Sequence, residues 1–79
     1  GVVVPRDALI RYPDGRVTVW VVRQEERGAV VHERQVETGL AFAGRVEVRA
    51  GLEAGARVVT RGNEALSEGQ PVRLTEAEE

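Results

Sequence analysis

The chain of 79 residues contains no cysteine, so neither a disulfide bond nor a thiolate metal site can stabilise it. For the same reason, cysteine usage does not reveal a redox compartment. The chain also lacks lysine: all eleven basic residues are arginine, they face thirteen acidic residues, and the formal net charge is −2. This balance is not typical of a protein that binds nucleic acid or an anionic membrane through its charge.

The sequence has no long apolar run, because none approaches the roughly 20 residues that a transmembrane helix needs. It also has no signal peptide, since Gly1 is followed directly by a strand-like run of valines. We therefore expect a fragment of a longer chain, whose destination the missing signal does not reveal. The length allows one domain, which we place at residues 1–75, and we expect residues 76–79 to be a disordered acidic tail.

Catalytic and metal-binding residue types are scarce. The chain has one histidine and one serine, and Ser67 lies where a turn is expected, so a Ser-His-Asp triad has no support. His32 has no second histidine and no cysteine beside which to bind a transition metal, and we expect it to be a half-exposed strand residue. We predict no enzymatic activity, no metal and no cofactor.

Short valine-rich runs separated by turn signals make up most of the chain. From Val17 to Val22, the odd positions carry valine and the even positions carry threonine, tryptophan and valine, so both faces are apolar and we expect a central strand. Other strands are expected at residues 2–4, 29–38, 45–49, 57–61 and 70–75, with a short strand or helical turn at residues 7–11. Pro5 marks the first of these as an edge strand or as the place where the strand ends, and Pro71 marks the last as an edge strand or as a strand start. We predict an all-β fold, a small sandwich or barrel of six or seven short, mostly antiparallel strands without a substantial helix.

The predicted fold is organised around residues 51–59. Gly51 and Gly55 can adopt backbone angles that other residues avoid, and Leu52 between them is expected to fill the core. The strands on either side are expected to form a hairpin-like unit through this turn. Further connections are predicted at residues 12–15 with Gly15, at residues 24–28, at residues 39–44 beginning with Gly39, and at residues 62–69, where Asn63 caps a helical turn between Gly62 and Gly69.

The three aromatic residues are assigned separate roles. Trp20 lies in the central strand and is expected in the core, although a contact surface is the alternative. Tyr12 borders a proline turn and is expected to pack there. Phe42 lies between glycines, where it is either tucked under the sheet, which we expect, or left exposed as an anchor for a partner.

An ordered set of residues runs through nearly the whole chain and is most specific between Gly51 and Gly62. Its members are Val4, Pro5, Ala8, Leu9, Gly15, Val19, Trp20, Val21, Val22, Val36, Gly39, Gly44, Val46, Val48, Gly51, Leu52, Gly55, Val58, Val59, Gly62, Leu66, Gly69 and Val72. This set resembles the C-terminal, membrane-proximal domain of periplasmic adaptor proteins, also called membrane fusion proteins, of RND-type tripartite efflux systems.

The resemblance implies a non-enzymatic coupling module in a periplasmic protein that is anchored to the inner membrane. In this family the adaptor docks on a proton-driven RND transporter, assembles with neighbouring adaptor protomers and reaches an outer-membrane channel through its other domains. Many members complete this domain with a strand from the adaptor's N-terminus, which would leave one sheet edge unpaired here. The exported substrate stays open, but the chain has no methionine, which does not support a metal-carrying role for this piece.

We expect the partner contacts on three loops, at residues 12–16, 24–28 and 40–44, which combine charge with apolar tips. The candidate contact residues are Tyr12, Asp14, Arg16, Glu25, Arg27 and Phe42. The residues expected to build turns and core are Pro5, Gly15, Trp20, Gly39, Gly51, Leu52, Gly55, Gly62 and Gly69.

Two other classes of function compete with this interpretation. A small barrel that binds nucleic acid or oligosaccharide needs exposed aromatic residues, and for nucleic acid also a basic groove. The negative net charge and the expected burial of Trp20 count against it. A structural domain of another secreted assembly is the third possibility.

Overall fold

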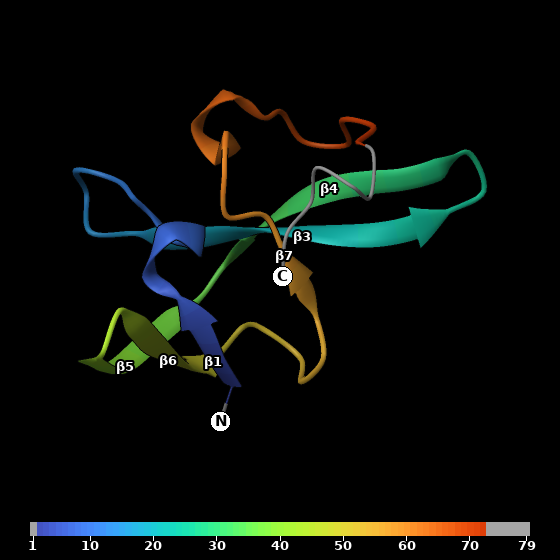
Figure 1. The fold of residues 1–79 in the computed structure, drawn as a ribbon. Helices are drawn as coiled ribbons and strands as arrows, with labels where there is room; N and C mark the ends of the chain where they lie inside the picture. The colour runs from blue at the N-terminus through green and yellow to red at the C-terminus, as the bar shows by residue number, and fades with distance from the viewer. Residues whose placement is uncertain (1, 73–79) are drawn as a thin grey trace.

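The computed structural model describes residues 2–72, which form two small antiparallel β-sheets packed against each other (Figure 1). One sheet has the strand order β1–β6–β5, and the other has the order β2–β3–β4 with β7 also paired to β3. The strands are β1 (Val2–Pro5), β2 (Ile10–Arg11), β3 (Val17–Glu25), β4 (Gly28–Gln35), β5 (Glu37–Phe42), β6 (Arg45–Ala50) and β7 (Arg57–Val58), and two 3-10 helices are η1 (Arg6–Ala8) and η2 (Asn63–Ala65). The predicted all-β fold is confirmed for this part of the chain.

The longest strand, β3, is the spine of the second sheet. It pairs with β4 from Thr18 to Glu25 on one side, and with β2 and then β7 on the other. Its alternation places Val19 and Val21 in one core and Trp20 in another, so both faces are covered. The prediction of a central strand is confirmed. Among residues 2–72, no helix is long and apolar enough to cross a membrane.

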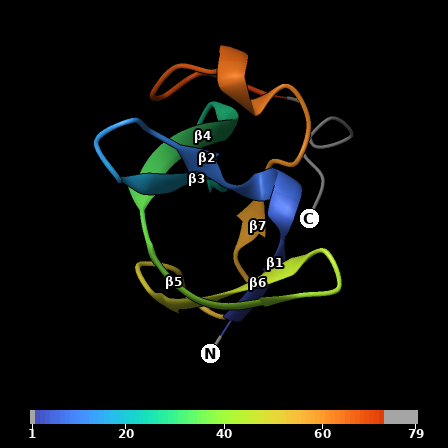
Figure 2. The same ribbon diagram turned by 90° about the vertical axis from the view of Figure 1, so that its left-hand side faces the viewer.

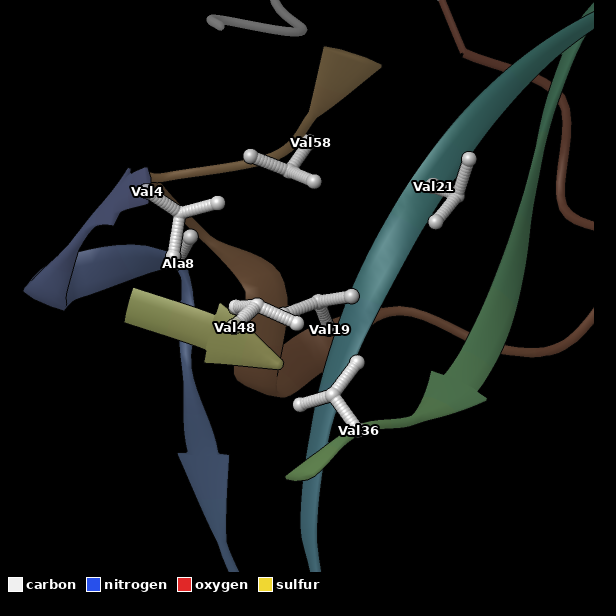
Figure 3. Close-up of a cluster of buried hydrophobic side chains, with 7 residues drawn as sticks. All are labelled: Val4, Ala8, Val19, Val21, Val36, Val48 and Val58. Carbon is white, nitrogen blue, oxygen red and sulfur yellow. The ribbon is translucent and has the colours of Figure 1, made fainter. Parts of the chain in front are cut away.

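The larger core joins the two sheets (Figure 3). Val4 of β1 and Val48 of β6 meet Val19 and Val21 of β3 there, as Figure 3 shows. The full set of buried residues is Val4, Ala8, Val19, Val21, Val36, Val48 and Val58. Each fully buried valine stabilises the fold by roughly 1.5 kcal/mol or more relative to an exposed one, so this cluster holds the sheets together.

The predicted strand at residues 29–38 is wrong in its extent, because the chain changes sheets at Val36. β4 ends at Gln35 in the second sheet and β5 begins at Glu37 in the first. Val36 between them is buried, and its backbone N–H donates to the carbonyl of Val17 at 2.9 Å. The predicted loop at residues 39–44 is therefore mostly strand. Only Ala43 and Gly44, both with positive φ, form the turn into β6.

The predicted hairpin around residues 51–59 is also wrong. β6 pairs with β1 and β5, whereas β7 pairs with β3, so the turn carries the chain from one sheet to the other. Gly51 and Gly55 have φ of +98° and +85°, as their expected role in the turn requires. Leu52 packs against the larger core, which confirms its predicted role. A hairpin was expected because sequence spacing does not show that the two strands bury their valines against different sheets.

The remaining connections depart from prediction in detail. Gln24 and Glu25 belong to β3, which shortens the predicted connection at 24–28, and β7 is shorter than the predicted strand at 57–61. The buried Asn63 does not cap η2, because its Nδ2 donates to the carbonyl of Asp7 at 3.0 Å and ties η2 to the segment around η1.

The predictions for the first strand, the turn at Gly15 and the last strand can be compared with the structure where it describes those residues. Pro5 ends the edge strand β1, and the turn at Gly15 forms, with its N–H donating to the Tyr12 carbonyl at 3.0 Å. Of the predicted last strand, Pro71 makes a single bridge with Val30. The rest of that strand and the predicted acidic tail lie outside the described residues.

The two glycines of the sheet-crossing turn provide a test of its geometry. A Cβ at Gly51 would overlap the backbone carbonyl oxygen of Gln35 and lie 3.0 Å from the Val36 Cα, whereas nothing lies within 4 Å of one at Gly55. Both alanine variants carry the left-handed strain of about 1–2 kcal/mol. We therefore expect Gly51→Ala to lower the free energy of unfolding, measured in urea, by at least about 1 kcal/mol more than Gly55→Ala. Equal losses would contradict the close approach at Gly51.

Candidate functional site

Large apolar side chains gather on the outer face of the β1–β6–β5 sheet. Val3, Leu40 and Phe42 are 44%, 69% and 54% exposed. Together with Glu47 they line one shallow hollow of about 230 Å³. In Figure 2 these strands form the layer opposite the β2–β3–β4 sheet. We call Val3, Leu40 and Phe42 the outer patch.

Strand alternation explains why these residues face outward. In β1, Val4 is buried, so its neighbour Val3 points away from the core, opposite its Cα partner Glu47. In β5, a register shift between Thr38 and Ala41 accommodates an extra residue, and Leu40 lies within this bulge. The Leu40 N–H donates to Glu47 Oε1 at 3.3 Å, which connects the bulge to β6.

Charged side chains border the outer patch. Arg45, Glu47 and Arg49 occupy alternate positions of β6 between the buried valines, and the Arg49 Nε lies 3.6 Å from Glu47 Oε1. An apolar centre with a polar rim is the usual arrangement of a protein contact surface. The expectation that Phe42 is tucked under the sheet is wrong, because this last residue of β5 is exposed, as in the alternative of a partner anchor.

The expected contact residues of the first loop, at residues 12–16, form hydrogen bonds, an ion pair and a cation–π contact within the domain. The hydroxyl of Tyr12 donates to Glu33 Oε2 at 2.5 Å, and the Arg16 guanidinium lies 4.3 Å from the centre of the Tyr12 ring. Arg16 Nε also pairs with Asp14 Oδ2 at 2.9 Å. The hydrogen bond that the Tyr12 hydroxyl donates to Glu33 raises the pKa of Tyr12, and the backbone N–H of Arg16, followed by its side chain, lowers the pKa of Asp14. These contacts fix the turn against β4.

A histidine clamp, consisting of Glu25, His32 and Glu68, connects three segments of the chain. His32 Nε2 lies 2.8 Å from Glu25 Oε2, and Nδ1 lies 2.5 Å from Glu68 Oε2. The other oxygen of Glu68 accepts the backbone N–H of Glu33 at 2.9 Å. The hydrogen bond to Glu68, and then that to Glu25, raises the pKa of His32, while His32 is the main cause that lowers the pKa of Glu68.

The clamp stabilises the edge of β4 rather than forming a metal site. Its two carboxylates approach different nitrogens of the ring, and no group of three potential metal ligands converges among residues 2–72. Glu68 directly precedes residues 69–72, which run beside β4 and hydrogen-bond to its backbone. The Gly69 N–H, for example, donates to the carbonyl of Val31 at 2.8 Å. The pairing of His32 with Glu68 could not be predicted from local spacing, because the two residues are 36 positions apart.

The structure does not bring the three predicted contact loops together. The turn at residues 12–16 precedes β3, and Arg27 follows its end, so the two lie at opposite ends of this nine-residue strand (Figure 1). Only Phe42 belongs to the outer patch. Val3 lies outside the predicted contact loops. Leu40 begins the predicted loop at residues 40–44 but was not among the named contact residues, although its two-residue spacing from Phe42 could have placed both on one face.

The predicted core aromatic residue is confirmed. Trp20 is 4% exposed and packs with Val31 and Val59, and its buried Nε1 has no hydrogen-bond partner in the described part of the chain. A buried indole cannot serve as a stacking platform for bases or sugars. The burial of Trp20 therefore counts against the competing interpretation as a barrel that binds nucleic acid or oligosaccharide.

Comparison with known proteins identifies the family. Residues 1–65 match the family described as RND MFPs, C-terminal permuted SH3 domain. The chain belongs to this family of membrane fusion protein domains. It is 40% identical over 77 residues to the multidrug resistance protein MdtA of Escherichia coli strain SMS-3-5 / SECEC, a match that covers 98% of this chain and 18% of that protein.

A second relative gives the same result. MdtA of Pantoea ananatis strain AJ13355 is 39% identical over 77 residues, with the same coverage of 98% and 18%. The membrane fusion protein domain therefore spans less than a fifth of the length of the curated relatives that it matches. No solved structure matches it. The resemblance to the C-terminal domain of RND adaptors is confirmed.

The histidine clamp makes a pH-dependent prediction. The pKa of His32 is raised above 6.5, so its contribution to stability is complete below pH 6.5 and is lost as the pH rises through the folded-state value. The pKa of Glu68 is lowered below 4.5, so its contribution is present above pH 4.5 and is lost as the pH falls through the folded-state value. We expect the urea midpoints of wild type and His32→Gln to differ most between these two pH values.

A variant outside the clamp provides the control. Glu64→Gln changes an exposed carboxylate on η2 without touching the clamp, so its midpoint should follow the wild-type pH profile. A difference between wild type and His32→Gln that does not change with pH would contradict the charged clamp.

Proposed function

We propose that this domain docks a periplasmic adaptor on an inner-membrane RND transporter, and that the outer patch makes this contact. The observation that carries the proposal is the gathering of Val3, Leu40 and Phe42 on one sheet face beside a charged rim. Scattered single apolar residues are common on protein surfaces, but a cluster of them with a polar border indicates an interaction site.

The chemistry of the outer patch fits a specific protein contact. Aromatic side chains are frequent among the residues that dominate binding energy, and fully burying a phenylalanine or leucine contributes roughly 1.5–3 kcal/mol. The arginines at 45 and 49 and Glu47 can then form polar contacts at the rim. Because the bulge and the Glu47 hydrogen bond hold the Leu40 backbone in place, little ordering is needed when a partner binds.

The family supplies the wider setting of this proposal. The parent protein would lie in the periplasm, be anchored to the inner membrane, contact neighbouring protomers and reach an outer-membrane channel through other domains. Its role would be coupling rather than catalysis. The names of the relatives, multidrug resistance proteins, favour drugs as the exported substrates. A strand from the parent's N-terminus would pair with one sheet edge of the domain.

Phe42→Asp in the full-length adaptor tests the contact. We expect the Kd for the purified transporter to rise at least tenfold, about 1.4 kcal/mol, because a carboxylate would be buried where an aromatic ring was. Drug export in cells that depend on the adaptor should fall accordingly. The thermal midpoint should hardly change, because Phe42 is exposed.

Ala65→Asp is the matched control, since it adds the same charge at an exposed position of η2, away from the outer patch. It should leave transporter binding unchanged. If Phe42→Asp binds the transporter as wild type does, the outer patch is not the contact. If the variant unfolds, Phe42 supports the fold instead.

A further inference from the structure

Gly39 is a glycine that its backbone conformation does not explain. Among residues 2–72 there are eight glycines, and seven of them have a positive φ, the region that favours glycine. Gly39 is the exception and lies inside the edge strand β5, where a glycine weakens the strand and adds no side chain to the packing. The reason for a glycine at this position must therefore come from the space around it.

Two side chains of β6 occupy that space. A Cβ at position 39 would overlap Glu47 Oε1 and would lie 2.5 Å from Arg49 Nε. The same carboxylate oxygen lies 3.6 Å from Arg49 Nε and accepts the Leu40 N–H at 3.3 Å. The Glu47 carboxylate thus lies against Gly39 while it binds the next residue of β5. Because both obstructing atoms belong to flexible side chains, an alanine at position 39 would displace them rather than distort the sheet.

The strand register shows why this hydrogen bond is needed. The pairs made by Thr38 and Ala41 enclose two residues on β5 and one residue on β6. Gly39 and Leu40 are the two, and Glu47 is the one. Such a bulge disrupts the backbone ladder locally, so the strand there depends on other contacts. The hydrogen bond from Leu40 to the Glu47 carboxylate is a contact of this kind.

The backbone position of Leu40 matters to the outer patch. Leu40 is more exposed than Val3 and Phe42, the other two members. A partner that buries Leu40 binds more tightly when the residue is already held in place, because ordering a mobile segment on binding costs free energy. If the Glu47 hydrogen bond were lost, this cost would be added to the binding step.

We propose that Gly39 is a positioning residue of the outer patch, where the missing side chain allows the Glu47 carboxylate to hold the Leu40 backbone for a partner. Gly39 needs no contact with the partner, because it acts through Glu47. The consequence for binding rests on the proposed docking role of the outer patch. The positioning itself is a property of the domain, so it can be measured without the transporter.

Amide hydrogen exchange in the full-length adaptor tests the positioning, with mass spectrometry and fragmentation to single residues to follow the Leu40 amide. We expect Gly39→Ala and Glu47→Ala each to speed its exchange by roughly twofold to tenfold, because one exposed hydrogen bond is lost. Glu47→Gln keeps an acceptor oxygen and should retain most of the protection. Exchange at the wild-type rate in Gly39→Ala would overturn the proposal.

Binding to the purified transporter tests what the positioning achieves. We expect Gly39→Ala to raise the Kd by about threefold to tenfold, the usual cost of ordering one side chain on binding, with little change in the thermal midpoint. In a Glu47→Ala background the same change should add nothing, because the carboxylate and its ion pair with Arg49 are absent. Equal effects in both backgrounds would show that Gly39 does not act through Glu47, and would overturn the proposal.

Further comparisons distinguish a failure of the Gly39 proposal from a failure of the docking proposal. Glu64→Ala removes the same charge as Glu47→Ala at an exposed position of η2, and should leave Leu40 exchange and transporter binding as in wild type. If Phe42→Asp weakens binding but Gly39→Ala does not, docking stands and the role of Gly39 is refuted. If Phe42→Asp binds as wild type does, docking fails, and the Leu40 exchange rates still decide the role of Gly39. A large loss of thermal midpoint in Gly39→Ala would show that Gly39 supports the fold instead.

Discussion

The fold depends on a single strand that buries both of its faces. Val19 and Val21 of β3 face the core between the sheets, and Trp20 faces the smaller core under the segment that contains η2. A domain of this size has little surface to bury, and most of its side chains in the core are valines. A shift of β3 by one residue would exchange its two faces and so disrupt both cores at once. The precise register of β3 with β4, β2 and β7 therefore controls the rest of the structure.

The two places where the chain changes sheets determine which residues remain on the surface. At Val36 and again after β6, the chain leaves one sheet and enters the other, and Gly51 passes against the backbone at Gln35 and Val36. These crossings place β5 at an edge of the first sheet, with Leu40 and Phe42 exposed. The connection after β6 also lies beside β3, where Leu52 packs against the larger core. The outer patch is thus a consequence of the sheet-crossing topology.

Local patterns predicted the strands but not their partners. The alternation from Val17 to Val22 identified β3 and its two apolar faces, and glycine placement identified the turns at Gly15, Gly51 and Gly55. The same alternation could not show that residues 29–38 divide between two sheets, because Val36 continues the periodicity across the break. The clamp of Glu25, His32 and Glu68 could not be predicted either, since it depends on the return of a distant segment to β4. Long-range pairing contributes no signal to the spacing of neighbouring residues.

Two large apolar side chains, Leu40 and Phe42, are exposed on the edge strand β5. An edge strand that carries Leu40 and Phe42 invites uncontrolled pairing with other chains, and proteins usually limit this risk with charges, bulges or a covering partner. Here the bulge at Leu40 interrupts the regular edge, and Arg45, Glu47 and Arg49 border the apolar centre on the neighbouring strand. These features limit nonspecific pairing through the backbone while leaving the apolar side chains available. Selection for solubility alone would replace Leu40 and Phe42 with polar residues, because neither fills a core. Their exposure beside an interrupted edge is therefore better explained by a side-chain contact with a partner than by the needs of folding.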